Sequence, residues 1–347
     1  MTEFDYGVVE NTQPIMVSGV YRSGTTFLSA LLGAHSQLKA SSSTIKFLRF
    51  CLGKYGDVSK EENYRRLLSD TNKRVQVRWN LSINVDKILQ QLKVIPQVTY
   101  AQLYDLMMNS MLLDGQSTAT RWVEKLAVQW EDIPFFLNMF PNGRVIHIYR
   151  DPRDVAASYK AMTFEPGNTF LDAAFNFRSA MENMDVMLEE FPDRLLIVKA
   201  EEISKNPVSM AKKICMFLNL DYEDSMINPS KLHTDGEDWS SNTSFGKSYK
   251  SIPDATPRWP EHLTRQEIIF IEMISQPFFA RAGYESSGFI PTKSDWDKIY
   301  SYITEPFLKE RFEKWLLFGL GSQGYRTDPY MHEMNIVFPE RFSKKDD

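Results

Sequence analysis

The segment of residues 17–35, VSGVYRSGTTFLSALLGAH, restricts the possible folds of this chain more than any other. Residues 15–20 form a short apolar run, which predicts a buried strand. Residues 25–34 carry apolar side chains at helical spacing, which predicts a helix. A strand, a glycine-containing loop and a helix in this order predict a unit of a parallel α/β sheet, with the loop at the carboxyl end of the strand.

The loop between this strand and this helix has the composition of an anion-binding site. Gly19 and Gly24 permit a tight turn, and the helix directs its backbone N–H groups and its dipole toward one point. The candidate binding residues, which add hydroxyl donors and one cation to these N–H groups, are Arg22, Ser23, Gly24, Thr25 and Thr26. The alternative is a glycine-rich turn without a ligand, because short glycine patterns also occur by chance.

Two features that bind a nucleoside triphosphate are missing from this sequence, one in the loop and one after a later strand. In that class a lysine followed by Ser or Thr ends the loop, and an acidic residue elsewhere helps to hold Mg²⁺. Here Thr25 stands in place of the lysine, and the predicted strand at residues 144–149 is followed by Arg150 rather than by an acid. We therefore expect a metal-free site for an anion of lower charge, such as a phosphosulfate.

A second candidate site follows the strand at residues 144–149. Asp151 before Pro152 predicts the start of a helix, with an N-cap and a proline in its first turn. Arg150 can make a forked contact to a phosphate, and Ser158, two turns into the helix, can add a hydroxyl. The alternative is a surface cluster of ion pairs among the residues Arg150, Asp151, Arg153 and Asp154.

The rest of the chain alternates in the same manner. Further strands are predicted at residues 122–126 and 195–198, and helices at residues 169–190 and 207–218. We expect an α/β fold with a central, mostly parallel sheet flanked by helices. Residues 41–118 are helical in pattern and predict an insertion between two elements of the sheet.

The later part of the chain has a different character. Residues 231–259 are polar and predict a long loop, and helical patterns return at 260–275 and 293–317. We expect one α/β domain over residues 1–290, with residues 291–347 as a helical extension and tail packed on it.

The two candidate sites together resemble those of sulfotransferases that use 3′-phosphoadenosine-5′-phosphosulfate. The resemblance rests on YRSGTT, RVIHIYRDPRDVAASY and LLIVKAEEISKNP, and it covers residues 14–50 and 120–285. It implies that the residues from Arg22 to Thr26 hold the 5′-phosphosulfate and that Arg150 and Ser158 hold the 3′-phosphate. It also implies adenosine 3′,5′-bisphosphate as the product, with no metal.

The resemblance adds candidates in two further segments. Lys125 lies where the family often has a strand-end lysine near the transferring sulfuryl group; the alternative is an exposed lysine without a role. Ser244 and Lys247, with Lys250, lie in a late segment that resembles the one folding over the donor. The alternative for that segment is a solvated linker.

The residues that usually serve as general base in the family are absent from this sequence. The positions that carry its usual histidine or glutamate hold Ala127 and approximately Ser43. His233 in the late loop and Glu124 beside Lys125 are the candidates that we weigh equally. The remaining candidates with a weaker claim are Glu237, Asp238, His35 and His147, the last two being expected to have structural roles.

Composition restricts the partners. The net charge of −5 argues against a nonspecific nucleic-acid binder, and no apolar run reaches membrane length. The only cysteines, Cys51 and Cys215, lie in apolar surroundings and predict reduced core residues in the cytoplasm. We expect a small-molecule acceptor with a hydroxyl or an amine, no nucleic acid and no membrane. The sequence does not indicate the oligomeric state.

Three functions remain open at this stage. The first is an active sulfotransferase that sulfates a small molecule or natural product. The second is a phosphate-loop kinase or nucleotide hydrolase, against which the missing lysine and the missing metal-binding acid both count. The third is a catalytically inactive relative that binds the nucleotide, which the absent base suggests.

Overall fold

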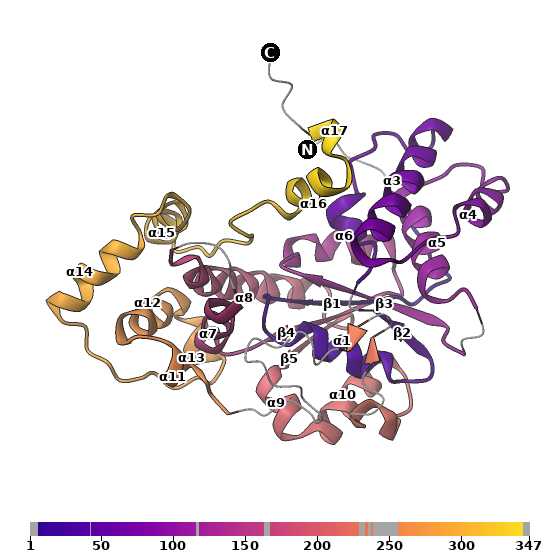
Figure 1. The fold of residues 1–347 in the computed structure, drawn as a ribbon. Helices are drawn as coiled ribbons and strands as arrows, with labels where there is room; N and C mark the ends of the chain where they lie inside the picture. The colour runs from indigo at the N-terminus through magenta and orange to yellow at the C-terminus, as the bar shows by residue number, and fades with distance from the viewer. Residues whose placement is uncertain are drawn as a thin grey trace, which may run out of the picture.

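The computed structural model describes residues 6–41, 43–115, 118–162, 167–228, 233–234, 237–238 and 256–342. Its centre is a five-stranded parallel sheet in the order β2-β3-β1-β4-β5 (Figure 1). The strands of this sheet are β1 (Ile15–Gly19), β2 (Leu38–Ala40), β3 (Arg121–Ala127), β4 (Arg144–Tyr149) and β5 (Leu195–Lys199). The predicted α/β class with a parallel sheet is confirmed.

Helices connect and cover these strands. The first half of the chain has α1 (Thr25–Gly33), α2 (Phe47–Phe50), α3 (Glu61–Trp79), α4 (Val85–Leu92), α5 (Tyr100–Leu112), η1 (Trp130–Asp132), α6 (Ile133–Met139), α7 (Pro152–Met162), η2 (Thr169–Leu171) and α8 (Asp172–Glu190). The second half has α9 (Ala200–Lys205), α10 (Pro207–Leu218), η3 (Asp224–Ile227), α11 (Trp259–His262), α12 (Arg265–Ser275), α13 (Phe278–Arg281), α14 (Lys293–Tyr302), α15 (Pro306–Phe318), α16 (Pro329–Val337) and α17 (Pro339–Phe342). A separate antiparallel pair joins β6 (His233–Thr234) to β7 (Glu237–Asp238).

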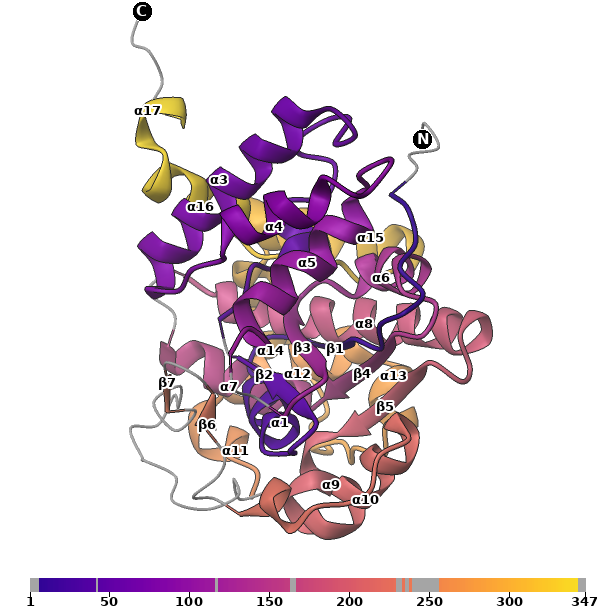
Figure 2. The ribbon, with the colours of Figure 1, turned by 90° about the vertical axis from the view of Figure 1, so that its right-hand side faces the viewer.

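The sheet is buried on both faces, as a parallel sheet requires. Along β1, Ile15 and Val17 pack into the core beneath α1 and α10, whereas Met16 packs into the larger core shared with α5, α6 and α8. Figures 1 and 2 show α1, α9 and α10 on one side of the sheet and α7 and α8 on the other. This alternation explains why β1 is continuously apolar up to Ser18.

The register of the sheet aligns the ends of its central strands. Gly19 lies opposite Ala127 of β3 and Ile148 of β4. The loop after β1 and the residues after β4 therefore leave the sheet at the same edge. This is the edge at which parallel α/β sheets bind their ligands.

Along the chain, helices α2 to α5 come between β2 and β3. In space, α16 packs against α3 (Figure 2). A buried ion pair holds this contact, with Arg74 of α3 bonded to Glu333 of α16 at 2.7 Å. In α17, the partly exposed Arg341 pairs with the buried Asp70 of α3 at 2.6 Å. The end of the chain is thus fixed to the helices inserted before β3.

The structure differs from the expected elements at two places. The sequence did not predict the short strand β2. Three residues are too few to show an apolar period, and they form a strand only by pairing with β3. The pattern at residues 293–317 corresponds to two helices, α14 and α15, since Pro306 starts a new helix. Cys51 and Cys215 are free and buried, as predicted.

Candidate functional site

The loop from Val20 to Gly24 has a backbone that only certain residues adopt easily. Arg22 has φ 63° and Gly24, the N-cap of α1, has φ 98°, both in the left-handed region. A Cβ on Gly24 would lie 3.3 Å from Ile148 Cδ1, so a side chain there would meet both strain and crowding. The turn brings the first N–H groups of α1 to the edge of the sheet, where they can bind an anion.

Hydroxyl groups surround this turn. The Ser23 side chain is 1 % exposed, and its Oγ has no hydrogen-bond partner within the described part of the chain. Thr26 Oγ1 accepts a hydrogen bond from Lys125 Nζ at 3.1 Å. A buried hydroxyl without a partner is costly, at about 1–3 kcal/mol, unless a ligand completes its bonding. The loop therefore fits a bound oxyanion.

A direct contact joins the two candidate sites. Arg22 Nε donates a hydrogen bond to Ser158 Oγ at 3.1 Å, although the two residues are far apart in the sequence. Burial, and then the positive charge of Arg150, lower the pKa of Arg22 to about 10. Two guanidinium groups are therefore gathered beside the loop, an arrangement that a bound anion would stabilise.

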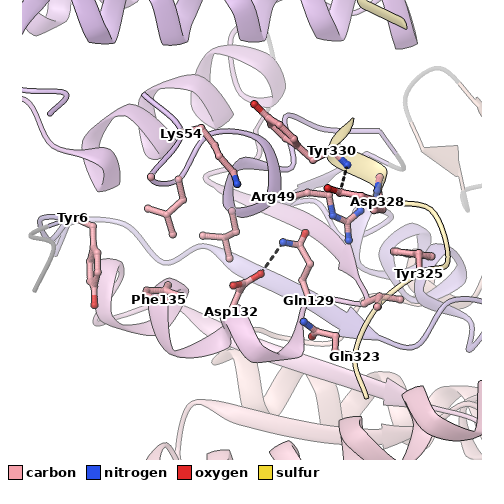
Figure 3. A pocket seen from close by; sticks show the side chains of 16 residues that line it. Tyr6, Arg49, Lys54, Gln129, Asp132, Phe135, Gln323, Tyr325, Asp328 and Tyr330 are labelled. Atoms are coloured by element: carbon pink, nitrogen blue, oxygen red, sulfur yellow. Dashed lines mark hydrogen bonds between the residues drawn. The ribbon is translucent and has the colours of Figure 1, made fainter. Parts of the chain in front are cut away.

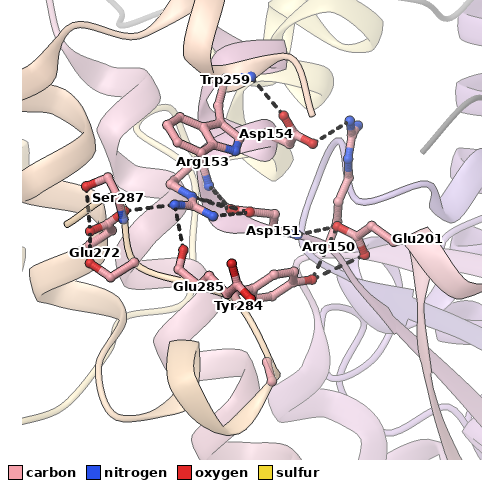
Figure 4. Close-up of polar contacts among 12 residues, drawn as sticks. Arg150, Asp151, Arg153, Asp154, Glu201, Trp259, Glu272, Tyr284, Glu285 and Ser287 are labelled. Carbon is pink, nitrogen blue, oxygen red and sulfur yellow. Dashed lines mark hydrogen bonds and ion pairs between the residues drawn. The ribbon is translucent and has the colours of Figure 1, made fainter. Parts of the chain in front are cut away.

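The residues around Arg150 form a buried network rather than the surface cluster considered as the alternative (Figure 4). Asp151 caps α7 by accepting from the Arg153 backbone N–H at 2.9 Å. The Arg153 guanidinium also bonds Asp151 at 2.7 Å and Glu272 of α12 at 2.8 Å. Most charges of this segment therefore fix the start of α7, because buried ions require partners.

Arg150 differs from its neighbours in this network. It is partly exposed and pairs with Asp154 Oδ2 at 3.2 Å. Asp154 in turn accepts from the backbone N–H groups of Arg258 at 2.8 Å and Trp259 at 3.0 Å. The same carboxylate thus orients Arg150 and holds the start of α11 against α7.

Lys125 and Glu124 point to opposite faces of β3, as strand alternation requires. Lys125 reaches Thr26 at the loop. Glu124 is fully buried and accepts from the Lys46 backbone N–H at 2.7 Å and from the hydroxyl of Tyr104. Burial raises the pKa of the Glu124 carboxyl. These contacts favour a structural role for Glu124, which would fix the chain at residues 44–47.

The other sequence candidates divide into two groups. His35 bonds the carbonyl oxygen of Asp221 at 2.9 Å, and His147 is fully buried beside Ser18 with its pKa lowered by burial to about 3. Both have the surroundings of structural histidines. The remaining candidates are not described in full, since Ser244, Lys247 and Lys250 lie outside the described residues, and only the backbone is described for His233, Glu237 and Asp238.

Tyr21 is a site residue to which the sequence assigned no role. Its ring packs on Tyr159 at 4.5 Å and stacks on Tyr325 at 5.7 Å between centroids. Its hydroxyl donates to Asp172 at 3.3 Å. The aromatic residue before Arg22 was the only available signal, and its partners come from segments that no local pattern connects to it.

The described residues contain no group of three or more His, Cys, Asp or Glu side chains placed to hold a metal ion. No helix in the described ranges combines the length and apolar composition needed to cross a membrane.

Known proteins are similar to this chain in sequence and in fold. Protein-tyrosine sulfotransferase A of Caenorhabditis elegans is 23 % identical over 89 % of this chain and 77 % of its own length. An uncharacterized protein of Aquifex aeolicus is 24 % identical over 73 % of this chain, which spans only 31 % of that protein. The sulfotransferase domain of the Synechococcus PCC 7002 olefin synthase has the same fold, with a TM-score of 0.54 and 18 % identity over 83 % of this chain and 100 % of that one.

The sulfotransferase family model matches residues 14–224, which is more than half of the chain. The match includes the candidate phosphate loop (residues 22–26), β3 with Lys125, and the start of α7 with Arg150 and Ser158. The chain therefore belongs to the sulfotransferase family.

Proposed function

We propose that this sulfotransferase takes the sulfuryl group from 3′-phosphoadenosine-5′-phosphosulfate and transfers it to a hydroxyl or an amine of a small molecule. The single observation that carries the proposal is the hydrogen bond from Arg22 to Ser158. It brings the loop after β1 and the helix after β4 together into one site with two adjacent guanidinium groups. A donor with phosphate groups at both its 3′ and 5′ positions matches such a pair of anion sites.

Each of these residues would have its own role toward the donor. The first N–H groups of α1, with Ser23 and Thr26, would hold the 5′-phosphosulfate, and Arg22 would balance its charge. Arg150 and Ser158 would hold the 3′-phosphate, since Asp154 keeps Arg150 oriented. Lys125, held at the loop by Thr26, would stabilise the charge that develops on the leaving phosphate.

Transfer forms a bond from the acceptor oxygen or nitrogen to sulfur as the bond from sulfur to the bridging phosphate oxygen breaks. The acceptor proton must go to a base. Of the two bases considered from the sequence, we retain His233, because β6 packs against α1, the helix that starts at the loop. We assign Glu124 to a structural role, and the cytoplasmic location stays a prediction from the sequence.

Calorimetric titration with adenosine 3′,5′-bisphosphate, beside ATP with Mg²⁺, tests the donor. We expect the bisphosphate to bind and ATP to bind weakly. Binding of ATP with Mg²⁺ but not of the bisphosphate would contradict the proposed donor.

The variant Arg150→Ala tests the assignment of the 3′-phosphate. We expect it to weaken bisphosphate binding by about 2 kcal/mol, which is the typical contribution of a charge-assisted contact. Binding of adenosine 5′-phosphosulfate, which lacks the 3′-phosphate, should hardly change. Asp154→Asn removes the ion pair but keeps the Arg150 guanidinium, so it should weaken bisphosphate binding less than Arg150→Ala does. Equal weakening of both nucleotides would show that Arg150 has another role.

A further inference from the structure

A cavity opens where three segments far apart in the sequence meet, residues 48–54, 128–135 and 323–330. Its volume is about 930 Å³, within the range of sites that hold small molecules. Figure 3 shows side chains from α2 and its following turn, from η1 and from the chain before α16 around one space. The cavity has the size and the mixed composition of a small-molecule site.

The cavity adjoins the phosphate loop. Val128 in its wall directly follows β3 and donates its N–H to the Gly19 carbonyl oxygen at 2.9 Å. Tyr325 in its wall stacks on Tyr21, the neighbour of Arg22. The described residues that line the cavity include none from Arg22 to Thr26. Its position therefore suits the second substrate rather than the donor.

Two cations line this cavity, Arg49 and Lys54 (Figure 3). Arg49 Nη2 donates to the carbonyl oxygen of Ala127 at 2.7 Å, and the guanidinium also bonds Tyr325. A guanidinium has five N–H donors, so these contacts leave donors for a ligand. Lys54 is exposed at the rim, with its ammonium 4.9 Å from the centre of the Tyr330 ring.

The acidic residues of the cavity already have hydrogen bonds from the protein. Asp132 accepts from Gln129 Nε2 at 2.8 Å, and Asp328 accepts from the Tyr330 backbone N–H at 2.9 Å, which caps α16. No ion pair of the described residues joins Arg49 or Lys54 to either carboxylate, although burial raises the pKa of the Asp132 carboxyl and both positive charges lower it by less. N–H donors of the two cations therefore remain available to an anionic ligand group.

The rest of the lining suits an aromatic body with a hydroxyl. The rings of Phe135, Tyr325 and Tyr330 line the cavity. Gln129 is 4 % exposed, and its Oε1 has no hydrogen-bond partner among the described residues. Figure 3 shows its amide between Asp132 and Arg49. A ligand O–H or N–H could complete its bonding.

We propose that this cavity binds the acceptor and that the acceptor is a small aromatic carboxylate held by Arg49 and Lys54. The inference rests on the proposed function, because it assigns the second substrate of the same reaction. It also assigns acceptor binding to both the inserted helices and the end of the chain, since each supplies one wall of the cavity.

Three phenols of similar size and different charge test the inference. They are 4-hydroxyphenylacetate, tyramine and 4-ethylphenol, which carry a negative charge, a positive charge and no charge. Each is titrated into the full chain with and without saturating adenosine 3′,5′-bisphosphate. We expect the carboxylate to bind at least about tenfold more tightly than the other two, as charge-assisted contacts imply.

Variants locate the source of this preference. Arg49→Gln should lower the affinity for 4-hydroxyphenylacetate about tenfold, and Lys54→Gln should lower it about threefold. The affinity for 4-ethylphenol should change little in both variants. Lys93→Gln, an exposed lysine outside the cavity, is the matched control and should change nothing. Lys54 lies at the rim, so its variant stays informative if Arg49→Gln fails to fold.

The outcomes separate the inference from the proposed donor. Loss of the preference in Arg49→Gln or Lys54→Gln, with bisphosphate binding retained, supports the inference. Equal affinities for the three phenols, tighter binding of tyramine, no binding of any of them, or an unchanged preference in both variants overturns it. Failure of the bisphosphate to bind contradicts the proposed donor instead, and the titrations without it still measure the preference.

Discussion

The proposed donor site and the proposed acceptor cavity are built in different ways. Consecutive residues from Arg22 to Thr26 form the proposed phosphate loop, and their own backbone conformation and the dipole of α1 would provide most of its binding groups. The cavity takes its walls from segments that meet only in the folded chain, and its cations come from side chains. Substitutions near the end of the chain should therefore leave donor binding unchanged, whereas they should weaken the binding of a ligand in the cavity.

Lys125→Met should give the largest effect and should act on the donor side alone. Without the ammonium at Thr26, we expect turnover to fall by roughly 10²–10³, the typical effect of removing one group that stabilises developing charge. Sulfation of the best acceptor from a phenol panel measures turnover, and calorimetry should show nearly unchanged bisphosphate affinity. Lys199→Met is the control, because Lys199 also ends a strand but bonds the Ala282 carbonyl oxygen at 2.8 Å. An unchanged rate in Lys125→Met would remove this residue from the mechanism.

Glu333→Gln should damage the cavity and spare the loop. The substitution leaves the buried Arg74 charge without its partner, at a cost of about 3 kcal/mol in the free energy of unfolding. Since α16 packs on α3, the affinity for 4-hydroxyphenylacetate should fall while folded protein still binds the bisphosphate. Urea denaturation and the two titrations measure these quantities. Glu340→Gln, an exposed partner of Lys73, should change stability by less than about 0.5 kcal/mol. Equal loss of both ligands in Glu333→Gln would show that the two regions are not independent.

Glu124→Gln should give the smallest effect, about 1 kcal/mol in the free energy of unfolding, because one hydrogen bond must change its direction. The folded-state pKa of Glu124 is raised above its ordinary value of 4.5. Above pH 4.5 the folded chain therefore keeps a proton that the unfolded chain has lost, and stability falls as pH rises toward the folded-state pKa. Urea denaturation at several pH values should show that Glu124→Gln lacks this decline.

Turnover decides between the two roles of Glu124. A structural residue should leave the rate per folded molecule nearly unchanged in Glu124→Gln. A large loss of rate with unchanged stability would restore Glu124 as the general base.

The sequence predicted the parts of the site that depend on neighbouring residues. The strand, loop and helix around Gly24, and Asp151 as the cap of α7, follow from local apolar period, glycine conformation and capping. It also gave the opposite orientations of Lys125 and Glu124, because alternation is a property of any strand. The roles of these residues toward a ligand stay proposals.

The sequence could not indicate how the charges near Arg150 divide. Its pattern allowed a surface cluster, and only the packing of α12 and α11 on α7 shows that Asp151 and Arg153 are buried and structural. Partners such as Glu272 lie too far along the chain for any local period to connect them. Burial decides which of these charges can still meet a ligand.

By itself, then, the sequence determined the parallel α/β sheet and the position of the glycine-containing loop between β1 and α1, since both arise from short-range patterns in apolar and glycine residues. Only the tertiary structure decided that Arg22 meets Ser158, that Tyr325 covers Tyr21, and that Arg49 faces a cavity. These contacts join distant segments, and their stability comes from packing and charge pairing that exist only once the whole chain has folded.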